Sequence, residues 1–401
     1  MNNNHSTRHS DITIIGAGPA GLSMACALAD SGLSITMVDL QSEDELANPK
    51  MDGREIALNH MSKTILSEWG VWDFFDQTQV HPLQDAKVLN GTSTDAIHFQ
   101  RTDKAGIEHG EPLGLLIANY HIRKALYQRV AQLDNVSFIT EKKVTNAHTT
   151  PDLSYVTLED GSQLTSQLLI GADNRFSNVR KMMGIGAKMT DYGRIMIVTN
   201  VRHTLPHHST AVENFKYGKT CAILPLDDKR ASIVITVNAD IAQNIKALNE
   251  DEFARMAEEL VEGELGTMTV DAPSVSYPLI GVYSDRFTKQ RCALIGDAAV
   301  GMHPVTAHGF NLGVRSADTL ANQILKALKS GKDIGSSAVL HPYELRHQVL
   351  AKPIYEGTNA VVKLFTNDHP AAKVLRGIAI KVSNNLPGIK QLINHRLTQV
   401  R

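Results

Sequence analysis

The sequence predicts an α/β protein in which a Rossmann-type nucleotide-binding domain is joined to a β-sheet domain and to C-terminal helices. Three observations predict this fold: a glycine-rich turn between a strand and a helix near the N-terminus, a central stretch rich in β-branched residues, and helical runs near the C-terminus. The chain has 401 residues, of which 42% are hydrophobic and 20% charged, so it is long enough for two or three globular domains.

The first element is the segment DITIIGAGPAGLSMACALADSGLSITMVDL, which begins at Asp11 and predicts a strand, a turn, a helix over Leu22–Asp30 and a second strand. Its turn fits the pattern G-x-G-x-x-G through Gly16, Gly18, Pro19, Ala20 and Gly21. The first glycine permits a tight turn, the second lets a pyrophosphate approach the backbone, and the third lets the helix pack on the strand. Asp39 ends the second strand, where a carboxylate binds a ribose hydroxyl. We therefore predict a dinucleotide site at the helix N-terminus.

A second glycine-rich loop, GDAAVGMHPVTAHGFNLG at 296–313, favours FAD over NAD as the dinucleotide. It follows the strand CALIG and precedes a helix, and a nicotinamide dehydrogenase needs no such loop. Asp297 could accept hydrogen bonds from a ribityl chain. The helix that begins near Gly309 could direct its N-terminus at the flavin ring, where it would stabilise the negative charge of reduced flavin by up to ~2 kcal/mol.

Three motifs together resemble those of class A flavin monooxygenases, which have the para-hydroxybenzoate hydroxylase-like fold: GAGPAG, GADNRFSNVR at 171–180, and the loop at 296–313. Within that superfamily the chain is most similar to the ubiquinone-biosynthesis hydroxylases of the UbiH/UbiF/VisC type and their UbiM branch. The resemblance implies that NAD(P)H, bound transiently, reduces FAD, and that O2 then gives a flavin C4a-hydroperoxide which hydroxylates an aromatic ring. It implies a polyprenyl phenol or benzoquinol as the substrate.

The resemblance also implies roles for individual residues. Asp39 would bind the adenosine ribose, Arg54 and Arg123 would lie near the pyrophosphate or ribityl chain, and Val144 would lie beside the adenine. Asp173 would support both FAD and nicotinamide binding, and Asp297 would hold the ribityl chain. The residues expected to approach the isoalloxazine are Ala307, Gly309, Phe310 and Asn311. Other interpretations stay open, since both arginines could be solvated and Asp173 could cap a turn.

Several positions depart from the family pattern. Val300 stands where relatives carry His, and Ala307-His308 stands where they carry Gly-Gln; Arg315-Ser316 replaces the usual Arg-Asp. Ala307 restricts the loop's conformations more than a glycine would. His308 adds a titratable ring beside the reacting flavin. The catalytic candidates are His308, His303 and Pro304, but no general base is identifiable, and a histidine that supports the loop through hydrogen bonds is the favoured interpretation.

The domain division that we expect has four parts. Residues 1–185 and 280–340 would form the FAD-binding domain, 186–279 a β-sheet substrate domain, and 341–401 a helical region. Tyr217, Leu224 and Pro225 are the candidates for substrate binding, and Leu226 and Phe310 for further apolar wall. The segment AILPLDD contains no cation, which favours an apolar ring and tail over a small anionic aromatic.

Composition limits the setting and the partners. A net charge of −2 gives no reason to expect nucleic-acid binding, and the histidines and three cysteines lack metal-ligand spacing. The polar N-terminus lacks a signal-peptide core, so we expect a cytoplasmic protein. From 371 to 401 there are six Lys or Arg and no Asp or Glu. This segment could pack with a solvated basic face, or contact a membrane surface or a biosynthetic complex.

Two other functions stay open at this point: a class A hydroxylase acting on a small soluble aromatic compound, and a non-catalytic FAD-bearing subunit of a biosynthetic complex. The sequence does not specify the ring position that is hydroxylated, the choice between NADH and NADPH, or the oligomeric state.

Overall fold

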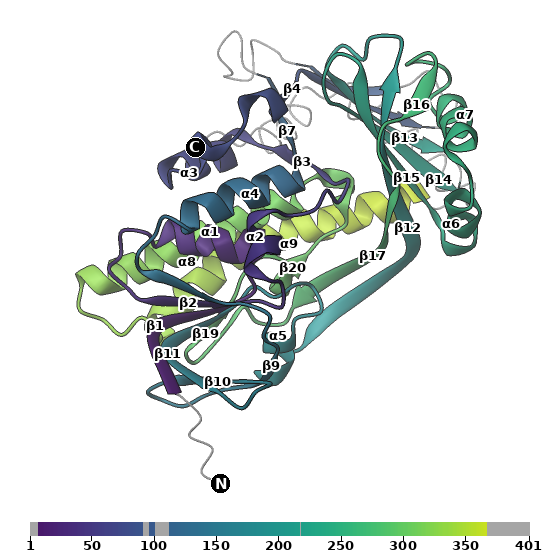
Figure 1. Ribbon diagram of the computed structural model, residues 1–401. Coiled ribbons are helices and arrows are strands. Elements are labelled where there is room, and N and C mark those ends of the chain that lie inside the picture. The colour runs from purple at the N-terminus through teal and green to yellow at the C-terminus, as the bar shows by residue number, and fades with distance from the viewer. Residues whose placement is uncertain (1–6, 91–95, 101–111, 217, 367–401) are drawn as a thin grey trace.

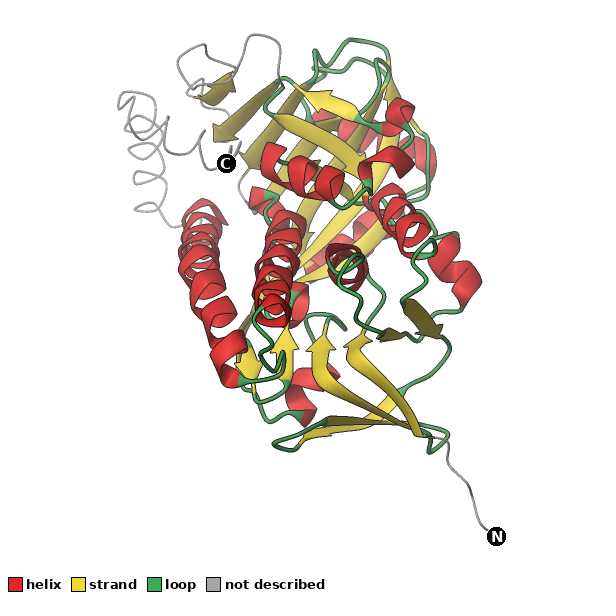
Figure 2. Cartoon of the chain, turned by 90° about the vertical axis from the view of Figure 1, so that its left-hand side faces the viewer, coloured by secondary structure: helices red, strands yellow, loops and turns green. Residues whose placement is uncertain are grey.

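The computed structural model describes residues 7–90, 96–100, 112–216 and 218–366 of the chain (Figure 1). Within these ranges the fold is built on three sheets, and helices fill the layer between the two larger ones (Figure 2). The predicted α/β fold is confirmed. The predictions for Tyr217 and for the basic segment 371–401 lie outside the described residues.

The nucleotide-binding half is an eight-stranded sheet in the described ranges, with the order β18-β19-β11-β1-β2-β8 and with β9 and β10 attached to β11. Strand β1 is central, and its Ile12 and Ile14 are fully buried because helices cover the sheet. Strands β1, β2, β8, β11 and β19 run parallel. The strands are β1 (Thr7–Ile15), β2 (Ile35–Val38), β8 (Val136–Ile139), β9 (Val144–Thr149), β10 (Ser154–Leu158), β11 (Gln163–Gly171), β18 (Thr288–Lys289) and β19 (Cys292–Leu294).

The first helix, α1 (Pro19–Ala27), begins and ends three residues earlier than the predicted Leu22–Asp30. It begins at Pro19 because proline has a helical φ and no N–H to leave unsatisfied at the first helical position. The other helices around the first sheet are α2 (Glu43–Ala47), α3 (His60–Glu68), α4 (Asn119–Val130), α5 (Asn178–Met182), α8 (Gly309–Lys329) and α9 (Ser337–Thr366). Helix α1 packs against both α4 and α8.

The second large sheet has the order β20-β17-β12-β15-β14-β13-β5-β6, and β16 pairs with β12. Helices α6 (Ala239–Lys246) and α7 (Glu250–Leu260) cover its outer face (Figure 1). Its strands are β5 (Asp85–Asn90), β6 (Ala96–Gln100), β12 (Ala187–His203), β13 (Thr210–Lys216), β14 (Lys219–Pro225), β15 (Arg230–Asn238), β16 (Met268–Val270), β17 (Val275–Ser284) and β20 (Val300–Gly301). Strands β5 and β6 therefore join this sheet from outside the expected range 186–279.

A small third sheet of β3 (Glu55–Leu58), β4 (His81–Leu83) and β7 (Gly114–Ala118) lies beside the start of α8. Two short 3-10 helices, Trp72–Phe74 and Gln77–Gln79, connect α3 to β4. Two more 3-10 turns, η4 (Gly296–Ala298) and η5 (Pro304–Thr306), form part of the loop at 296–313. None of the helices in the described ranges combines the length and hydropathy needed to cross a bilayer.

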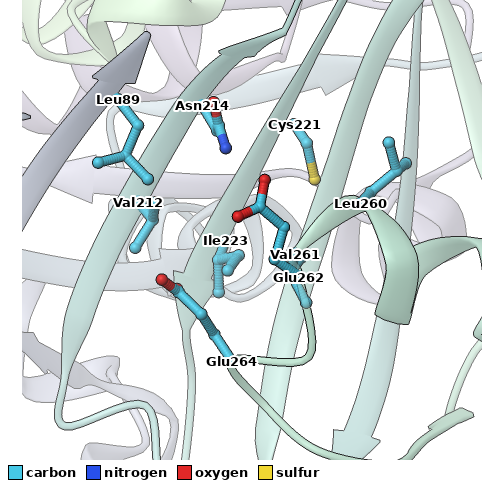
Figure 3. A pocket seen from close by; sticks show the side chains of 9 residues that line it. All are labelled: Leu89, Val212, Asn214, Cys221, Ile223, Leu260, Val261, Glu262 and Glu264. Atoms are coloured by element: carbon cyan, nitrogen blue, oxygen red, sulfur yellow. The ribbon is translucent and has the colours of Figure 1, made fainter. Parts of the chain in front are cut away.

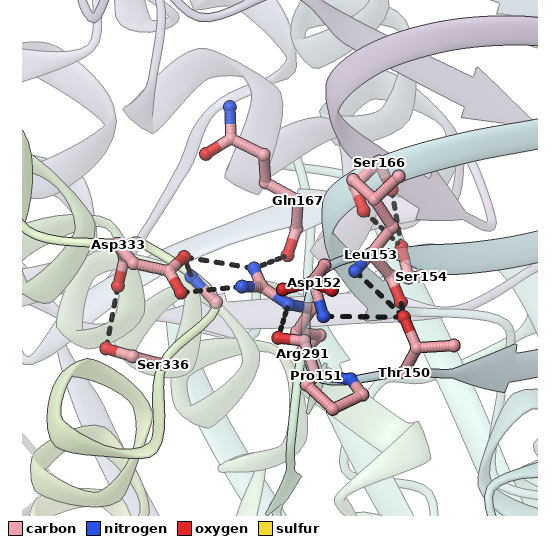
Figure 4. Close-up of polar contacts among 11 residues, drawn as sticks. Thr150, Pro151, Asp152, Leu153, Ser154, Ser166, Gln167, Arg291, Asp333 and Ser336 are labelled. Carbon is pink, nitrogen blue, oxygen red and sulfur yellow. Dashed lines mark hydrogen bonds and ion pairs between the residues drawn. The ribbon is translucent and has the colours of Figure 1, made fainter.

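Arg291 anchors the strand that leads into this loop (Figure 4). Its guanidinium donates to both carboxylate oxygens of Asp333, at 3.0 and 2.6 Å, and to the carbonyl oxygens of Gln167 and Pro151. The residue is 7% exposed. Because its partners come from β11, the β9–β10 turn and the α8–α9 connection, it fixes the start of β19 relative to all three.

Candidate cofactor and substrate site

The three glycines after β1 have different surroundings. Gly16 has a φ of +103°, and a Cβ there would lie 2.5 Å from the carbonyl oxygen of Ala172. A Cβ on Gly21 would lie 1.9 Å from the carbonyl oxygen of Gly16. A Cβ on Gly18 would meet no atom within 4 Å. The open side of Gly18 is therefore where a ligand can approach the backbone, as the pattern predicts.

Two helix N-termini converge on the loop at 296–313. A Cβ on Gly296 would lie 2.5 Å from the Cβ of Ala20, the second residue of α1. The Cα of the same glycine lies beside Gly313, in the second turn of α8. Glycine occupies the position before α1, so no side chain caps the first N–H groups of that helix. The N-termini of α1 and α8 both carry partial positive charge. Together they suit an extended ligand that has negative charge at two places.

Asp39 lies at the end of β2 and faces the glycine turn. Its carboxylate accepts hydrogen bonds from the N–H groups of Ala17, at 2.6 Å, and Gln41, at 2.8 Å. The Gln41 side chain in turn accepts a hydrogen bond from Arg123 at 2.7 Å. Burial lowers the pKa of the Arg123 guanidinium, and Asp52 and Asp39 act against that shift. Asp39 and Arg123 thus lie together beside the turn.

Val144 begins β9 and is buried. The residues just before Val144 lie beside the end of β2, because the N–H of Lys142 donates to the carbonyl oxygen of Asp39. This places Val144 near Asp39, and its contact with adenine stays a prediction.

Arg54 lies where the nucleotide-binding half meets the second large sheet. It forms an ion pair with Asp52 at 2.5 Å, and its guanidinium lies over the Tyr277 ring, 5.4 Å from the centroid. Its side chain is 43% exposed. Asp52 also accepts hydrogen bonds from Asn119 and, through its carbonyl oxygen, from Tyr277. Arg54 is therefore oriented by its neighbours while its charge stays accessible to a ligand.

Asp297 is paired with Arg175, which was not among the predicted site residues. Its carboxylate accepts hydrogen bonds from Arg175 Nη2 at 2.8 Å and Nε at 3.2 Å. Arg175 also donates to the carbonyl oxygen of Ile280, and its own carbonyl oxygen accepts from Arg180. Arg180 is buried and donates to the carbonyl oxygen of Ala298. Both arginines belong to the GADNRFSNVR motif at 171–180, so the motif itself was the sequence signal that could have identified them.

Asp173 of the same motif caps a short helix. It accepts hydrogen bonds from the Ser177 hydroxyl at 2.6 Å and from the N–H groups of Asn178 and Val179 at the start of α5. These contacts fit the turn-capping interpretation of Asp173. They also fix α5, and so Arg175 and Arg180, against the 296–313 loop.

His303 and Pro304 begin the turn η5. The His303 ring is buried, its Nδ1 accepts a hydrogen bond from the N–H of Val305 at 3.2 Å, and it lies edge-on to the Tyr192 ring at 4.8 Å. Burial, with Arg175 nearby, lowers the pKa of His303 to about 4. A neutral imidazole with this geometry supports the loop, which fits the structural interpretation better than a role as a general base.

The following residues form the start of α8. Ala307 has a φ of +52°, in the left-handed region where glycine is favoured, and His308 is the N-cap residue. Gly309 is open on its Cβ side. The Asn311 amide donates to the carbonyl oxygens of Ala57 and Ala307 and accepts from the N–H of Asn59, so it joins α8 to β3 and α3.

Phe310 points in a different direction from the rest of this group. Its ring packs with Met61, Ile65 and Val314, on the side of α3. We expected it to contribute to an apolar substrate wall, and the structure shows no packing of Phe310 with the second large sheet among the described residues.

The second large sheet turns one face toward α6 and α7 and the other, which we call the inner face, toward α9 and η5. Strand alternation places Leu224 on the inner face, in register with Ser232. Pro225 pairs with Ala231, which packs in the outer cluster, so it points to the outer face. The prediction that Leu224 and Pro225 share one wall is therefore wrong, because consecutive strand residues face opposite sides.

The geometry fits FAD. The turn at Gly18 is open, Asp39 and Arg123 lie at one end, and Asp297 and the N-terminus of α8 lie at the other. The hydroxyl of Ser316 accepts a hydrogen bond from the N–H of Gly296 at 3.1 Å, which joins the loop to α8. The sequence motifs predicted most members of this group, but not the partners that orient them.

Comparisons with known proteins show the family and the fold of this chain. A family model described as an FAD binding domain matches residues 9–355. Ubiquinone hydroxylase UbiM of Neisseria meningitidis serogroup C is 47% identical over 390 residues, which cover 97% of this chain and 85% of that protein. Ubiquinone hydroxylase UbiL of Rhodospirillum rubrum is 32% identical over 383 residues, which cover 96% and 88%. The crystal structure of p-nitrophenol 4-monooxygenase PnpA from Pseudomonas putida DLL-E4 has a TM-score of 0.77 at 19% identity, covers 98% of this chain and 99% of its own, and shows the shared fold.

Proposed function

The chain belongs to the FAD-binding family of ubiquinone hydroxylases, and we propose that it hydroxylates the ring of a prenylated phenol or benzoquinol in ubiquinone biosynthesis. FAD is the bound cofactor, and NAD(P)H and O2 are the co-substrates. The observation that carries the proposal is the similarity to ubiquinone hydroxylases along nearly the whole chain. The convergence of two helix N-termini on one loop supports it.

When bound, FAD supplies the activation of oxygen, and the protein supplies binding, orientation and dryness. The turn from Gly16 to Gly21 would hold the pyrophosphate, with Asp39 on the ribose. Asp297, oriented by Arg175, would hold the ribityl chain. The N-terminus of α8 would face the electron-rich end of the ring and stabilise its negative charge.

The inner face of the second large sheet is the surface that we propose for the substrate. Its central residues Ala222, Val234 and Val198 lie in register on adjacent strands, and Met196 extends the apolar surface. An apolar face suits a ring with an isoprenoid tail, and it excludes water from the reacting atoms. His303 and Pro304 would position the loop beside the ring rather than transfer protons.

The reaction can be tested with the purified, FAD-loaded protein. We expect 2-geranylphenol to stimulate oxidation of NADPH or NADH and to yield a hydroxylated product that mass spectrometry detects, and we expect 4-hydroxybenzoate, a small anionic phenol, to do neither. Product from 4-hydroxybenzoate alone would favour the small soluble aromatic as substrate. A protein that holds FAD and produces nothing from either phenol would support the non-catalytic subunit. Quinone profiling of a deletion strain would then identify the ring position from the precursor that accumulates.

A further inference from the structure

Glu213 lies on the inner face of the second large sheet. Its neighbours in sequence, Val212 and Asn214, point to the outer face, where Figure 3 shows them with Cys221 and Ile223 facing the segment after α7. Because strand residues alternate, Glu213 points to the opposite side. The sheet register places it between Val88 on β5 and Ala222 on β14.

This position is next to the loop that leads into α8. Phe215, two residues along the same face, contacts the Phe365 ring of α9 with 4.5 Å between centroids. Val305, in the turn η5, packs in the same cluster. Glu213 therefore lies on the proposed substrate surface, in register with Ala222 and on the same face as the residues that contact α9 and η5.

The surroundings of the carboxyl are unusual for a charged group. No ion pair involving Glu213 occurs within the described part of the chain, and the residues beside it in register are apolar. Burial raises the pKa of the Glu213 carboxyl to about 7, and a hydrogen bond with Thr220 opposes that shift. The residue is nevertheless only half-buried. Ionising a carboxyl in these surroundings is costly when no cation lies beside it, and such a group is a candidate for a functional residue.

The other titratable groups on the surrounding elements face elsewhere or are uncharged. On β5, β6, β13 and β14 they point to the outer face, where Lys216 pairs with Glu262 at 2.7 Å, while Arg194 of β12 donates to the carbonyl oxygen of Gly218 at the β13–β14 turn. On η5, His303 is neutral because its pKa is low, and on α9 Lys363 is exposed. The outward-pointing groups are Asp85, Lys87, His98, Lys216, Lys219 and Cys221.

We infer that Glu213 binds the ring hydroxyl of the substrate and removes its proton. The inference rests on the proposed function. In the step, the phenol O–H bond breaks, the proton passes to a carboxylate oxygen of Glu213, and the electron pair stays on the ring oxygen. The electron-rich ring then accepts the oxygen atom more readily. When the hydroxylated ring regains its aromaticity, the ring carbon loses its proton to solvent and Glu213 returns the proton to the oxygen. This makes Glu213 both a catalytic residue and a determinant of specificity for phenols.

The test compares Glu213→Gln with Glu262→Gln, a matched change on the outer surface. With 2-geranylphenol as the probe and rates normalised to FAD content, Glu213→Gln should lower product formation about 100-fold, while Glu262→Gln should leave it unchanged. The wild-type rate of product formation should rise as pH increases through about 7. The rate of Glu213→Gln should not show this rise. A Glu213→Gln protein that hydroxylates the probe at the wild-type rate would overturn the inference.

Binding distinguishes this inference from the proposed function. Wild type should bind 2-geranylphenol more tightly than its O-methyl ether, measured by flavin fluorescence, and Glu213→Gln should lose most of that preference. An unchanged preference contradicts the role of Glu213, whereas a wild type that binds the phenol selectively but makes no product contradicts only the proposed reaction. If Glu213→Gln does not fold, Thr220→Val serves instead. Loss of the Thr220 hydrogen bond should move the rise in the rate of product formation to higher pH. A pH–rate profile that does not move would again overturn the inference.

Discussion

At the scale of single residues, the glycine turn shows how one short pattern contains separate physical requirements. Gly21 is needed by the fold, because any side chain there would overlap the backbone of Gly16. Gly18 has an ordinary φ of −75° and free space around it, so the fold itself tolerates a side chain there. What Gly18 provides is close approach for a ligand. The two roles can be separated experimentally.

We predict that Gly18→Ala leaves the melting temperature of the FAD-free protein within about 1 °C of wild type but weakens FAD binding at least about tenfold, or ~1.4 kcal/mol. Gly21→Ala should destabilise the FAD-free protein by about 3 kcal/mol or more, because the overlap is with backbone. Thermal unfolding and flavin titration check both. A Gly18→Ala protein that retains FAD normally would show that the pyrophosphate lies elsewhere.

At the scale of elements, α9 connects the two halves of the molecule. It has 30 residues, contains Pro342 and Pro353, and extends from the nucleotide-binding half to the inner face of the second large sheet (Figure 1). The sequence predicted helical runs here but not one helix through two prolines. Proline removes a hydrogen bond within a helix. Packing at both ends offsets that cost, as the buried Tyr343 and Phe365 show.

The contact between Phe215 and Phe365 should couple these elements. In a double-mutant cycle of Phe215→Leu and Phe365→Leu, measured by urea unfolding, we expect a coupling energy of about 0.5–1.5 kcal/mol, typical of an aromatic pair. The control cycle pairs Phe215→Leu with Phe253→Leu, whose ring packs in the outer cluster. Additive effects in the first cycle would show that α9 is not held through this pair.

At the scale of the whole molecule, buried ionisable groups set the pH range of stability. Burial, with Asp52 nearby, raises the pKa of Glu55 to about 7, and burial raises the pKa of Glu213 similarly. Burial lowers the pKa of His303 to about 4 and of His347 to about 3. Because of the two histidines, the free energy of unfolding decreases as pH falls below about 6.5. The unfolded chain then binds protons on these histidines that the folded chain does not bind. The two glutamates have the opposite effect: they lower the free energy of unfolding as pH rises.

Between about pH 4.5 and 7 the folded protein holds a proton on Glu55 that the unfolded chain releases, so this group lowers the free energy of unfolding as pH rises. We predict that Glu55→Gln stabilises the protein by about 1–3 kcal/mol at pH 8 relative to its effect at pH 4. Urea unfolding of the FAD-saturated protein at both values measures this. An equal effect at the two values would mean that Glu55 is ionised throughout the range.

By itself, the sequence determined the local motifs, namely the glycine turn with Asp39 and the strand–loop–helix around Asp297. Each depends on neighbours within a few tens of residues, and short-range sterics and helix dipoles impose the same geometry in any context. Only the tertiary structure decided that Arg175 orients Asp297 from 122 positions away, that Leu224 and Pro225 face opposite sides, and that Glu213 lies on the inner face of the second large sheet. These outcomes depend on strand register and on packing between distant segments, which no local pattern specifies.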